Sequence, residues 1–237
     1  MKCLLSVCLV TSLAVAGVHA IVQSVEASQS PAQILQKGVS VKMAGANSAQ
    51  PMPEADNFDA WIVTVAADGQ LYFGVDPVGP SVLQQRMIRS PRKRGQRLYI
   101  KADARASFAS VQRALEAASE AAFESPVLLV SQPSSAKPGT IASPKGLEVV
   151  MDGAANGGAK PVVEMNYSAQ GSPTLRVDDQ EIPLAELQER LHQLVQNQKT
   201  KTILLRADGR AVFGDVAQVI DACRAAGAAV VVATPVV

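Results

Sequence analysis

The sequence predicts an α+β fold made of two tandem two-layer sandwiches, and three observations carry this prediction. Residues 100–111 and 205–216 repeat one another, with Asp, Arg and Phe at matching positions 105 residues apart. Each copy has an apolar strand, a polar turn and then a helix with an apolar face. Each copy also ends in a β-branched run, at 126–130 and 229–233. Because the interval is constant and free of gaps, it indicates an internal duplication, and we expect one domain per copy.

The first domain is expected over residues 57–131 with the order β-β-α-β-α-β. Two apolar runs, 61–66 and 70–75, are joined by Asp68-Gly69, which favours a tight hairpin turn. Pro80 is a favourable first residue for a short helix. The remaining elements are a strand at 98–102, a helix at about 107–122 and a strand at 126–130. Two helices beside one small mixed sheet pack most economically on one face of it.

The second domain is expected over residues 161–237 with the same order. Its hairpin comprises 162–167 and 174–177, and Pro183 begins a helix with a leucine stripe of helical period. The stripe consists of Leu184, Leu187, Leu191 and Leu194, and the later elements are a strand at 202–206, a helix at 213–226 ended by Gly227, and a strand at 229–233. A linker at 132–160 joins the domains, and within it 147–151 is expected to add one edge strand.

The amino terminus has the features of an export segment. Met1-Lys2 precedes an uncharged run from Cys3 to Gln23, and Val18-His19-Ala20 suits cleavage after Ala20. The run is also long enough, at about 20 residues, to span a bilayer if it is not cut. Residues 1–20 are therefore either a signal peptide or an uncleaved anchor, and both alternatives export the remainder. Residues 21–56, rich in Ser, Ala, Gln and Pro, are expected to be a flexible tether.

The charge distribution argues against nucleic-acid binding. The formal net charge of the 237 residues is +1 and only 4% are aromatic, so neither a basic field nor base-stacking side chains are available. The one basic cluster has Arg92, Lys93 and Arg94 at its centre. Two interpretations remain open for it: a solvated loop, or a contact with anionic lipid, cell-wall polymer or acidic protein.

Side chains for catalysis or metal binding are scarce. Cys3 and Cys8 lie in the export segment, so Cys223 is the one thiol beyond it, and its helical register indicates a buried apolar role. His192 falls outside the leucine stripe and is expected to face water. The glycine-rich stretch 153–158 lacks the strand, helix and Lys-Ser/Thr of a phosphate loop. We therefore expect no enzyme activity, no metal and no cofactor.

The repeated turns carry the other candidate residues. Asp103 and Asp208 follow strand ends, where a carboxylate can accept backbone N–H groups and fix the turn into the next helix. A partner-binding role is the alternative for Asp208 and for Arg210 beside it. Phe108 and Phe213 are expected to anchor the core at the start of each helix.

Three segments of the second domain resemble the periplasmic domain of the ExbD/TolR family. They are Val177-Asp-Asp-Gln-Glu-Ile-Pro-Leu-Ala-Glu-Leu187, Ile203-Leu-Leu-Arg-Ala-Asp-Gly-Arg-Ala-Val-Phe-Gly-Asp-Val216 and Ala226-Gly-Ala-Ala-Val-Val-Val-Ala-Thr234. The resemblance covers Pro161 to Val237 well and Ala60 to Ser131 more loosely. It implies a non-enzymatic, homodimeric subunit of an energy-transducing transport complex. The implied partners are an ExbB/TolQ-like membrane protein or a TonB/TolA-like periplasmic protein.

The resemblance has one informative departure. The family implies an acidic residue inside its membrane helix for proton passage, whereas no Asp or Glu precedes Glu26 in this chain. We therefore expect an exported subunit in the periplasm, or in the inner membrane if the anchor is kept, that does not itself conduct protons. The alternative is a soluble periplasmic module that binds a cell-wall or other anionic ligand through the basic loop.

Overall fold

The computed structural model describes residues 38–93, 95–123, 125–131, 143–151, 160–168, 172–196 and 201–233. Both repeats belong to one compact unit, Pro31–Val237. The predictions made for the export segment, for Arg94 and for residues 153–158 lie outside the described residues.

The first repeat contains the predicted elements and one additional short strand. Its elements are β2 (Trp61–Val65), β3 (Leu71–Phe73), β4 (Asp76–Val78), α1 (Pro80–Arg89), β5 (Leu98–Ala102), α2 (Phe108–Glu120) and β6 (Val127–Val130). The order is thus β-β-β-α-β-α-β, and the predicted order lacked β4. The α+β class is confirmed.

The second repeat has the same order of elements. They are β8 (Val162–Tyr167), β9 (Pro173–Val177), β10 (Gln180–Ile182), α3 (Leu184–Gln196), β11 (Thr202–Ala207), α4 (Phe213–Ala225) and β12 (Ala229–Val232). The leucine stripe of α3 is shifted relative to the prediction, because Leu187, Leu191 and Val195 are buried whereas Leu184 is 44% exposed. Leu184 is therefore available at the surface.

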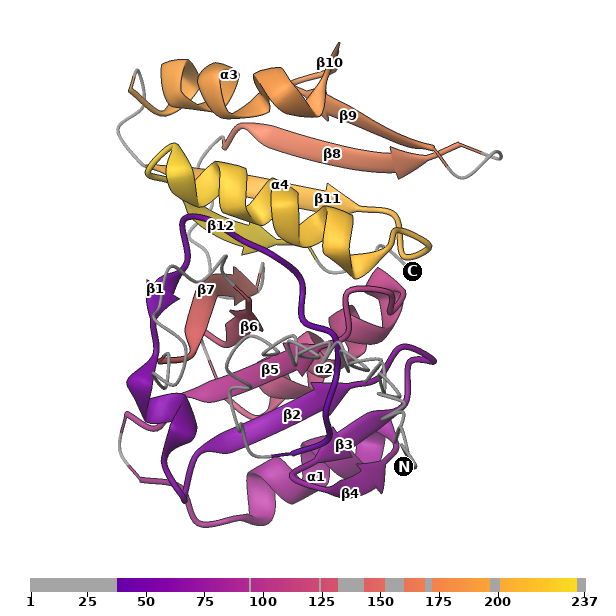
Figure 1. Ribbon diagram of the computed structural model, residues 1–237, viewed down its shortest axis with the longest axis vertical. Helices are drawn as coiled ribbons and strands as arrows, with labels where there is room; N and C mark the ends of the chain where they lie inside the picture. Colours follow the sequence, from indigo (N-terminus) through magenta and orange to yellow (C-terminus); the bar gives the residue numbers. More distant parts are fainter. Residues whose placement is uncertain are drawn as a thin grey trace, which may run out of the picture. The chain divides into compact units, whose positions relative to one another are not determined.

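One sheet runs through both repeats (Figure 1). Among the described residues its order is β10-β9-β8-β11-β12-β7-β6-β5-β2-β3-β4, where β7 is Lys145–Met151. The prediction of β7 as an edge strand is wrong. It lies at the centre of the sheet, parallel to β12 and antiparallel to β6. The two repeats are joined through this strand, and β4 and β10 form the outer edges.

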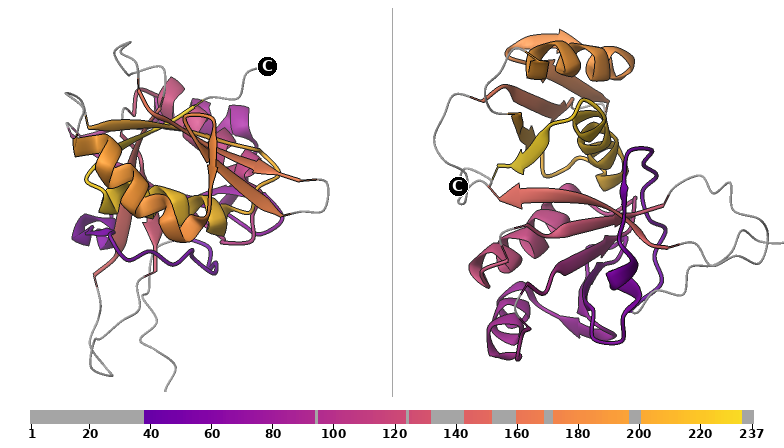
Figure 2. Two further views of the ribbon diagram at one scale, coloured as in Figure 1. Left: turned by 90° about the horizontal axis from the view of Figure 1, so that it is seen from above. Right: turned by 90° about the vertical axis from the view of Figure 1, so that its left-hand side faces the viewer.

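The two faces of the sheet differ in what covers them. On one face, strand residues such as Ile100 and Leu205 pack with α1 to α4 in the main core. On the other face of the first repeat, Ile62, Tyr99 and Leu129 pack against Met52 and Ala55 of the amino-terminal segment. Figure 2 (right) shows this indigo segment and the magenta helices on opposite sides of the strands. The first repeat therefore has apolar cover on both faces.

The corresponding face of the second repeat has charged side chains at two positions of the sheet. By strand register, Glu164 stands where the first repeat has Thr64, and Arg206 stands where it has Lys101. Glu164 and Arg206 form an ion pair at 3.4 Å, and the Arg206 side chain is 56% exposed.

The end of the predicted tether is ordered in the structure. Lys42 binds the Asp103 turn, β1 (Gln50–Pro51) pairs with β7, and a 3₁₀ helix, η1 (Pro53–Asp56), follows. Met43–Ser48 cross between the repeats on the way. The prediction of a flexible tether therefore does not hold for residues 42–56, whose backbone is used in pairing.

Candidate functional site

Each repeated turn is closed by an Asp and the Arg two residues later. The Asp103 carboxylate accepts hydrogen bonds from Arg105 N at 3.0 Å and Arg105 Nε at 2.8 Å, and also from Lys42 N at 3.0 Å. The Asp208 carboxylate accepts bonds from Arg210 N at 2.8 Å and Arg210 Nη2 at 2.6 Å. Both Arg side chains are about 70% exposed, at 67% and 71%.

These bonds favour the ionised carboxylates. The hydrogen bonds from the Arg105 side chain hold the pKa of Asp103 well below its usual range, although burial opposes the change. The Arg210 side chain likewise lowers the pKa of Asp208 to about 2. The geometry is that of a turn fixed by a carboxylate, with a guanidinium left facing solvent.

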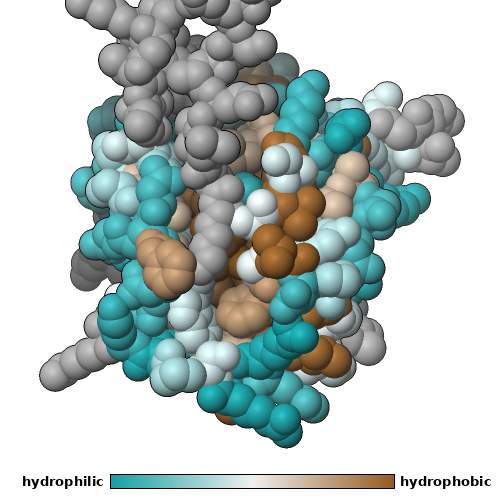
Figure 3. Space-filling view, turned by 60° about the horizontal axis from the view of Figure 1, so that its bottom comes forward, coloured by the Kyte–Doolittle hydropathy of each residue, from teal (hydrophilic) through white to brown (hydrophobic). Residues whose placement is uncertain are grey.

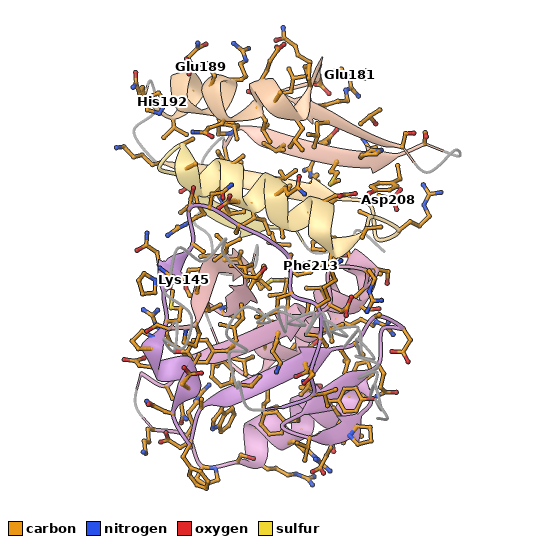
Figure 4. The ribbon with its side chains drawn as sticks, viewed as in Figure 1. Lys145, Glu181, Glu189, His192, Asp208 and Phe213 are labelled. Atoms are coloured by element: carbon orange, nitrogen blue, oxygen red, sulfur yellow. The ribbon has the colours of Figure 1, made fainter. Side chains whose placement is uncertain are left out.

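The two turns lie against each other where the repeats meet. Phe108 N donates to Ala211 O at 2.7 Å, and Phe213 N donates to Ala106 O at 2.9 Å. Both phenyl rings are fully buried. Figure 4 shows the labelled Phe213 at this junction, at the beginning of α4. The structure thus brings the two predicted core anchors and the two turns together in one place.

The basic loop is tied to the first repeat by its own side chains. Arg92 Nη1 donates to Ala121 O at 2.9 Å, and the guanidinium stands 4.6 Å from the centre of the Phe123 ring. Lys93 pairs with Asp59, although its side chain remains 79% exposed. A hollow of about 540 Å³ beside the loop is lined by Arg92, Lys93, Arg97 and also by Glu148. Arg92 is therefore used in packing, and Lys93 faces solvent.

A groove of about 480 Å³ opens in the second repeat beside the outer strand β10. Its apolar lining includes Ile182, Leu184 and Val219, and its charged lining consists of Glu181 and Asp215. The Asp215 carboxylate accepts a hydrogen bond from Tyr167 Oη. Glu181 is labelled at the top of Figure 4. Among the residues that the structure describes, no Lys or Arg lines this groove, so it suits an apolar ligand segment that carries positive charge.

The equivalent region of the first repeat has different side-chain contacts. Gln70 Nε2 donates to Leu71 O at 2.8 Å and to Val78 O at 3.1 Å, so the side chain lies along β3 and β4. The hairpin turn packs directly on α2, since a Cβ at Gly69 would lie 2.5 Å from Ser110 Oγ. The two repeats therefore share a fold but differ at this surface.

Apolar side chains are also exposed at the end of the first repeat. The side chains concerned are Phe58, Val75, Val82 and Ile88. Figure 3 shows the end of the molecule that lies at the bottom of Figure 1, where brown hydrophobic surface stands between teal hydrophilic side chains. These residues were not singled out from the sequence, because isolated apolar residues in loops and on short helices carry no periodic signal.

Two titratable residues singled out from the sequence, His192 and Asp208, lie apart. His192 is exposed on α3, next to Gln196, at the opposite side of the second repeat from Asp208 (Figure 4). Cys223 is buried on α4, as predicted, and burial raises the pKa of its thiol to about 12. Within the described ranges, no group of three or more His, Cys, Asp or Glu side chains could hold a metal ion.

One residue with a clear structural role escaped the sequence prediction. Asp221 lies on the buried face of α4 and accepts the backbone N–H groups of Asn47 and Ser48 at 2.8 and 2.7 Å. The sequence pattern that could have identified Asp221 is a carboxylate on the apolar face of the helix, between Ile220 and Cys223. A charged side chain is seldom buried on such a face without hydrogen-bond partners.

None of the helices in the part of the chain that the structure describes is long and apolar enough to cross a membrane. A family model described as "Biopolymer transport protein ExbD/TolR" matches the sequence twice, over residues 27–133 and 128–235. The two matches agree with the duplication read from the sequence. No curated protein and no solved structure matches the chain significantly.

Proposed function

The chain belongs to the ExbD/TolR family of biopolymer transport proteins, and from this premise we propose that it is a non-enzymatic binding subunit of an energy-transducing envelope complex. It acts through protein–protein contacts, as a subunit beside an ExbB/TolQ-like membrane protein or as an accessory to it. The separation of His192 from Asp208 supports a binding role over a catalytic one.

The observation that carries the proposal is the groove beside β10. An outer strand has a row of backbone groups that an extended segment of another protein can pair with. Beside this strand, Ile182 and Leu184 provide an apolar surface, and Glu181 provides negative charge. The occupant we propose is an extended segment of a TonB/TolA-like periplasmic protein, with apolar side chains next to Lys or Arg.

A photo-crosslinking experiment tests this contact. A photoreactive phenylalanine analogue replaces Leu184 in the full chain, expressed in a Gram-negative host, and crosslinked products are identified by mass spectrometry. Val82 is the matched control, since it is an apolar helix residue of the first repeat with similar exposure, 48% against 44%. We expect a TonB/TolA-like protein to be captured from position 184 and not from position 82.

Two outcomes would refute the binding proposal. Equal capture from both positions would mean that exposure alone explains the contact. Capture of cell-wall fragments from the loop around Lys93, with none at position 184, would favour the ligand-binding module.

Export is tested by intact mass and cell fractionation. A product that begins at Ile21 in the soluble periplasmic fraction would identify a released binding module. A product that keeps Met1 in the inner membrane would identify an anchored subunit, and we then expect an ExbB/TolQ-like protein to co-purify with it.

A further inference from the structure

The contacts between the two turns are reciprocal at the repeat interval. Phe108 bonds to Ala211, and the residues 105 positions away, Phe213 and Ala106, form the matching bond. A second pair of bonds follows the same rule: Ala109 N donates to Gly209 O at 2.9 Å, and Gly214 N donates to Ala104 O at 2.8 Å. Such exchange of partners is the pattern of a two-fold interface.

The local symmetry axis is fixed by one further pair. Ser107 and Val212 form an isolated antiparallel bridge, and they are themselves equivalent positions of the two repeats. When a residue pairs with its own counterpart, the axis passes between the two residues. The other reciprocal bonds are arranged on either side of this bridge.

From this pattern we infer that one chain is a complete two-fold unit, in which the second repeat occupies the place that a second copy would take. The sheet supports the inference, because β7 joins β6 to β12 and leaves no inner edge to pair with another molecule. The residues of the junction are also covered, since Ala106, Phe108, Ala211 and Phe213 are all fully buried. This goes beyond the binding role proposed above and replaces the expected homodimer by a monomer.

Small side chains at the junction disfavour the pairing of two first repeats. A Cβ built at Gly209 would lie 3.1 Å from Ala109 Cβ, and one built at Gly214 would lie 3.1 Å from Ala104 O. The first repeat has Ala104 and Ala109 where the second has Gly209 and Gly214. Two first repeats would therefore crowd an alanine against an alanine at both contacts, whereas the mixed pair places an alanine against a glycine each time.

Cysteine pairs test whether the junction closes within one chain. The Cβ that a residue at 214 would carry lies 3.5 Å from Ala104 Cβ, within the range of about 3.5–4.5 Å found in disulfides. The full chain carries Ala104→Cys and Gly214→Cys, with Cys3→Ser and Cys8→Ser as background. After oxidation we expect a disulfide inside one chain, seen as a linked peptide pair at the mobility of a single chain. Ala104→Cys with Gly79→Cys is the control, and we expect no bridge there.

A second arm distinguishes pairing within a chain from pairing between chains. Two differently tagged chains, one with Ala104→Cys and one with Gly214→Cys, are co-expressed in the same background. We expect no disulfide-linked dimer, and native mass spectrometry of the unmodified protein is expected to give the mass of one chain. A linked dimer between the tags, a native mass of two chains, or the absence of the bridge in the double variant would each overturn the inference. The crosslink from position 184 does not depend on this result, so the two proposals fail separately.

Discussion

The carboxylate of Asp221 on α4 accepts a hydrogen bond from the backbone of Asn47, 174 residues earlier in the chain, at 2.8 Å. Ser48 N binds the other carboxylate oxygen at 2.7 Å. Segment 42–52, which begins on the first repeat, is thus fastened to the second repeat by one buried side chain.

Replacing that carboxylate should loosen the segment. We expect Asp221→Ala to lower the free energy of unfolding by about 1.5–3 kcal/mol, because two backbone donors lose a charged acceptor. Urea denaturation measures this change, and amide exchange at Asn47 and Ser48 should become faster. Asp76→Ala is the control, since that carboxylate is 64% exposed in an ion pair with Arg86, and its effect should stay within about 1 kcal/mol. Equal effects of the two substitutions would contradict the role given to Asp221.

The turn carboxylates predict a loss of stability in acid. The pKa of Asp103 and of Asp208 is lowered by hydrogen bonds from Arg105 and Arg210, to about 2 for Asp208. A carboxyl group whose pKa is lower in the folded than in the unfolded chain stabilises the fold. This stabilisation is complete at pH values above the unfolded pKa, about 3.9, and it is lost as the pH falls through the folded pKa.

We therefore expect the free energy of unfolding to fall between pH 5 and about pH 2, and Asp103→Asn to flatten this dependence. At neutral pH the Asp103→Asn cost should be about 1.5–3 kcal/mol, because the Asp103 side chain is only 3% exposed. Asp76→Asn, in an ion pair whose carboxylate is 64% exposed, is the control. A wild-type pH profile that Asp103→Asn leaves unchanged would show that the turn does not depend on ionisation.

The thiol of Cys223 should be unreactive in the folded protein. Burial raises its pKa to about 12, so at pH 8 both the thiolate fraction and the access of a reagent are low. In the Cys3→Ser, Cys8→Ser background, a disulfide reagent should label it on the order of a thousandfold more slowly without urea than with it. Rapid labelling of the folded chain would mean that α4 opens readily.

The sequence was informative where one element carries its own pattern. The 3.6-residue period placed α2 and α4 correctly, and the Asp-Gly turn placed the first hairpin. The strands β4 and β10 were missed because each has three residues and shows no alternation of apolar and polar positions. β4 includes Pro77, and β10 includes Gln180 and Glu181. The position of β7 was also missed, since alternation predicts a strand but not its neighbours.

The junction and the groove depend on information that no single segment contains. The reciprocal bonds join backbone groups of Ala and Gly residues, which carry no side-chain signal of their own. At the groove beside β10, the second repeat lacks the Gln70 contacts of the first, as Thr174 stands at the equivalent place. Duplication could be read from the sequence, but the difference between the surfaces of the two copies had to be seen in the structure.

The ends of α2 and α4 permit a reciprocal test of backbone strain. Both helices end with an equivalent hydrogen bond, from Phe123 N to Ala118 O in α2 and from Ala228 N to Cys223 O in α4, and this bond requires a left-handed residue just before the donor. In the second repeat that residue is Gly227, with φ +83°, whereas the first repeat uses Ala122, with φ 59°. An alanine in this conformation is strained by contact of its Cβ with the backbone.

We expect Ala122→Gly to raise the free energy of unfolding by about 0.5–1 kcal/mol and Gly227→Ala to lower it by about 1 kcal/mol. A Cβ at Gly227 would meet no atom within 4 Å, so strain alone decides the second value. Ala121→Gly is the control, because φ is −86° there and glycine relieves nothing. Thermal or urea denaturation measures all three variants. If Ala122→Gly destabilised the protein as much as Ala121→Gly, the contacts of Arg92 with Ala121 O and the Phe123 ring, rather than the backbone conformation, would be setting the stability of this helix end.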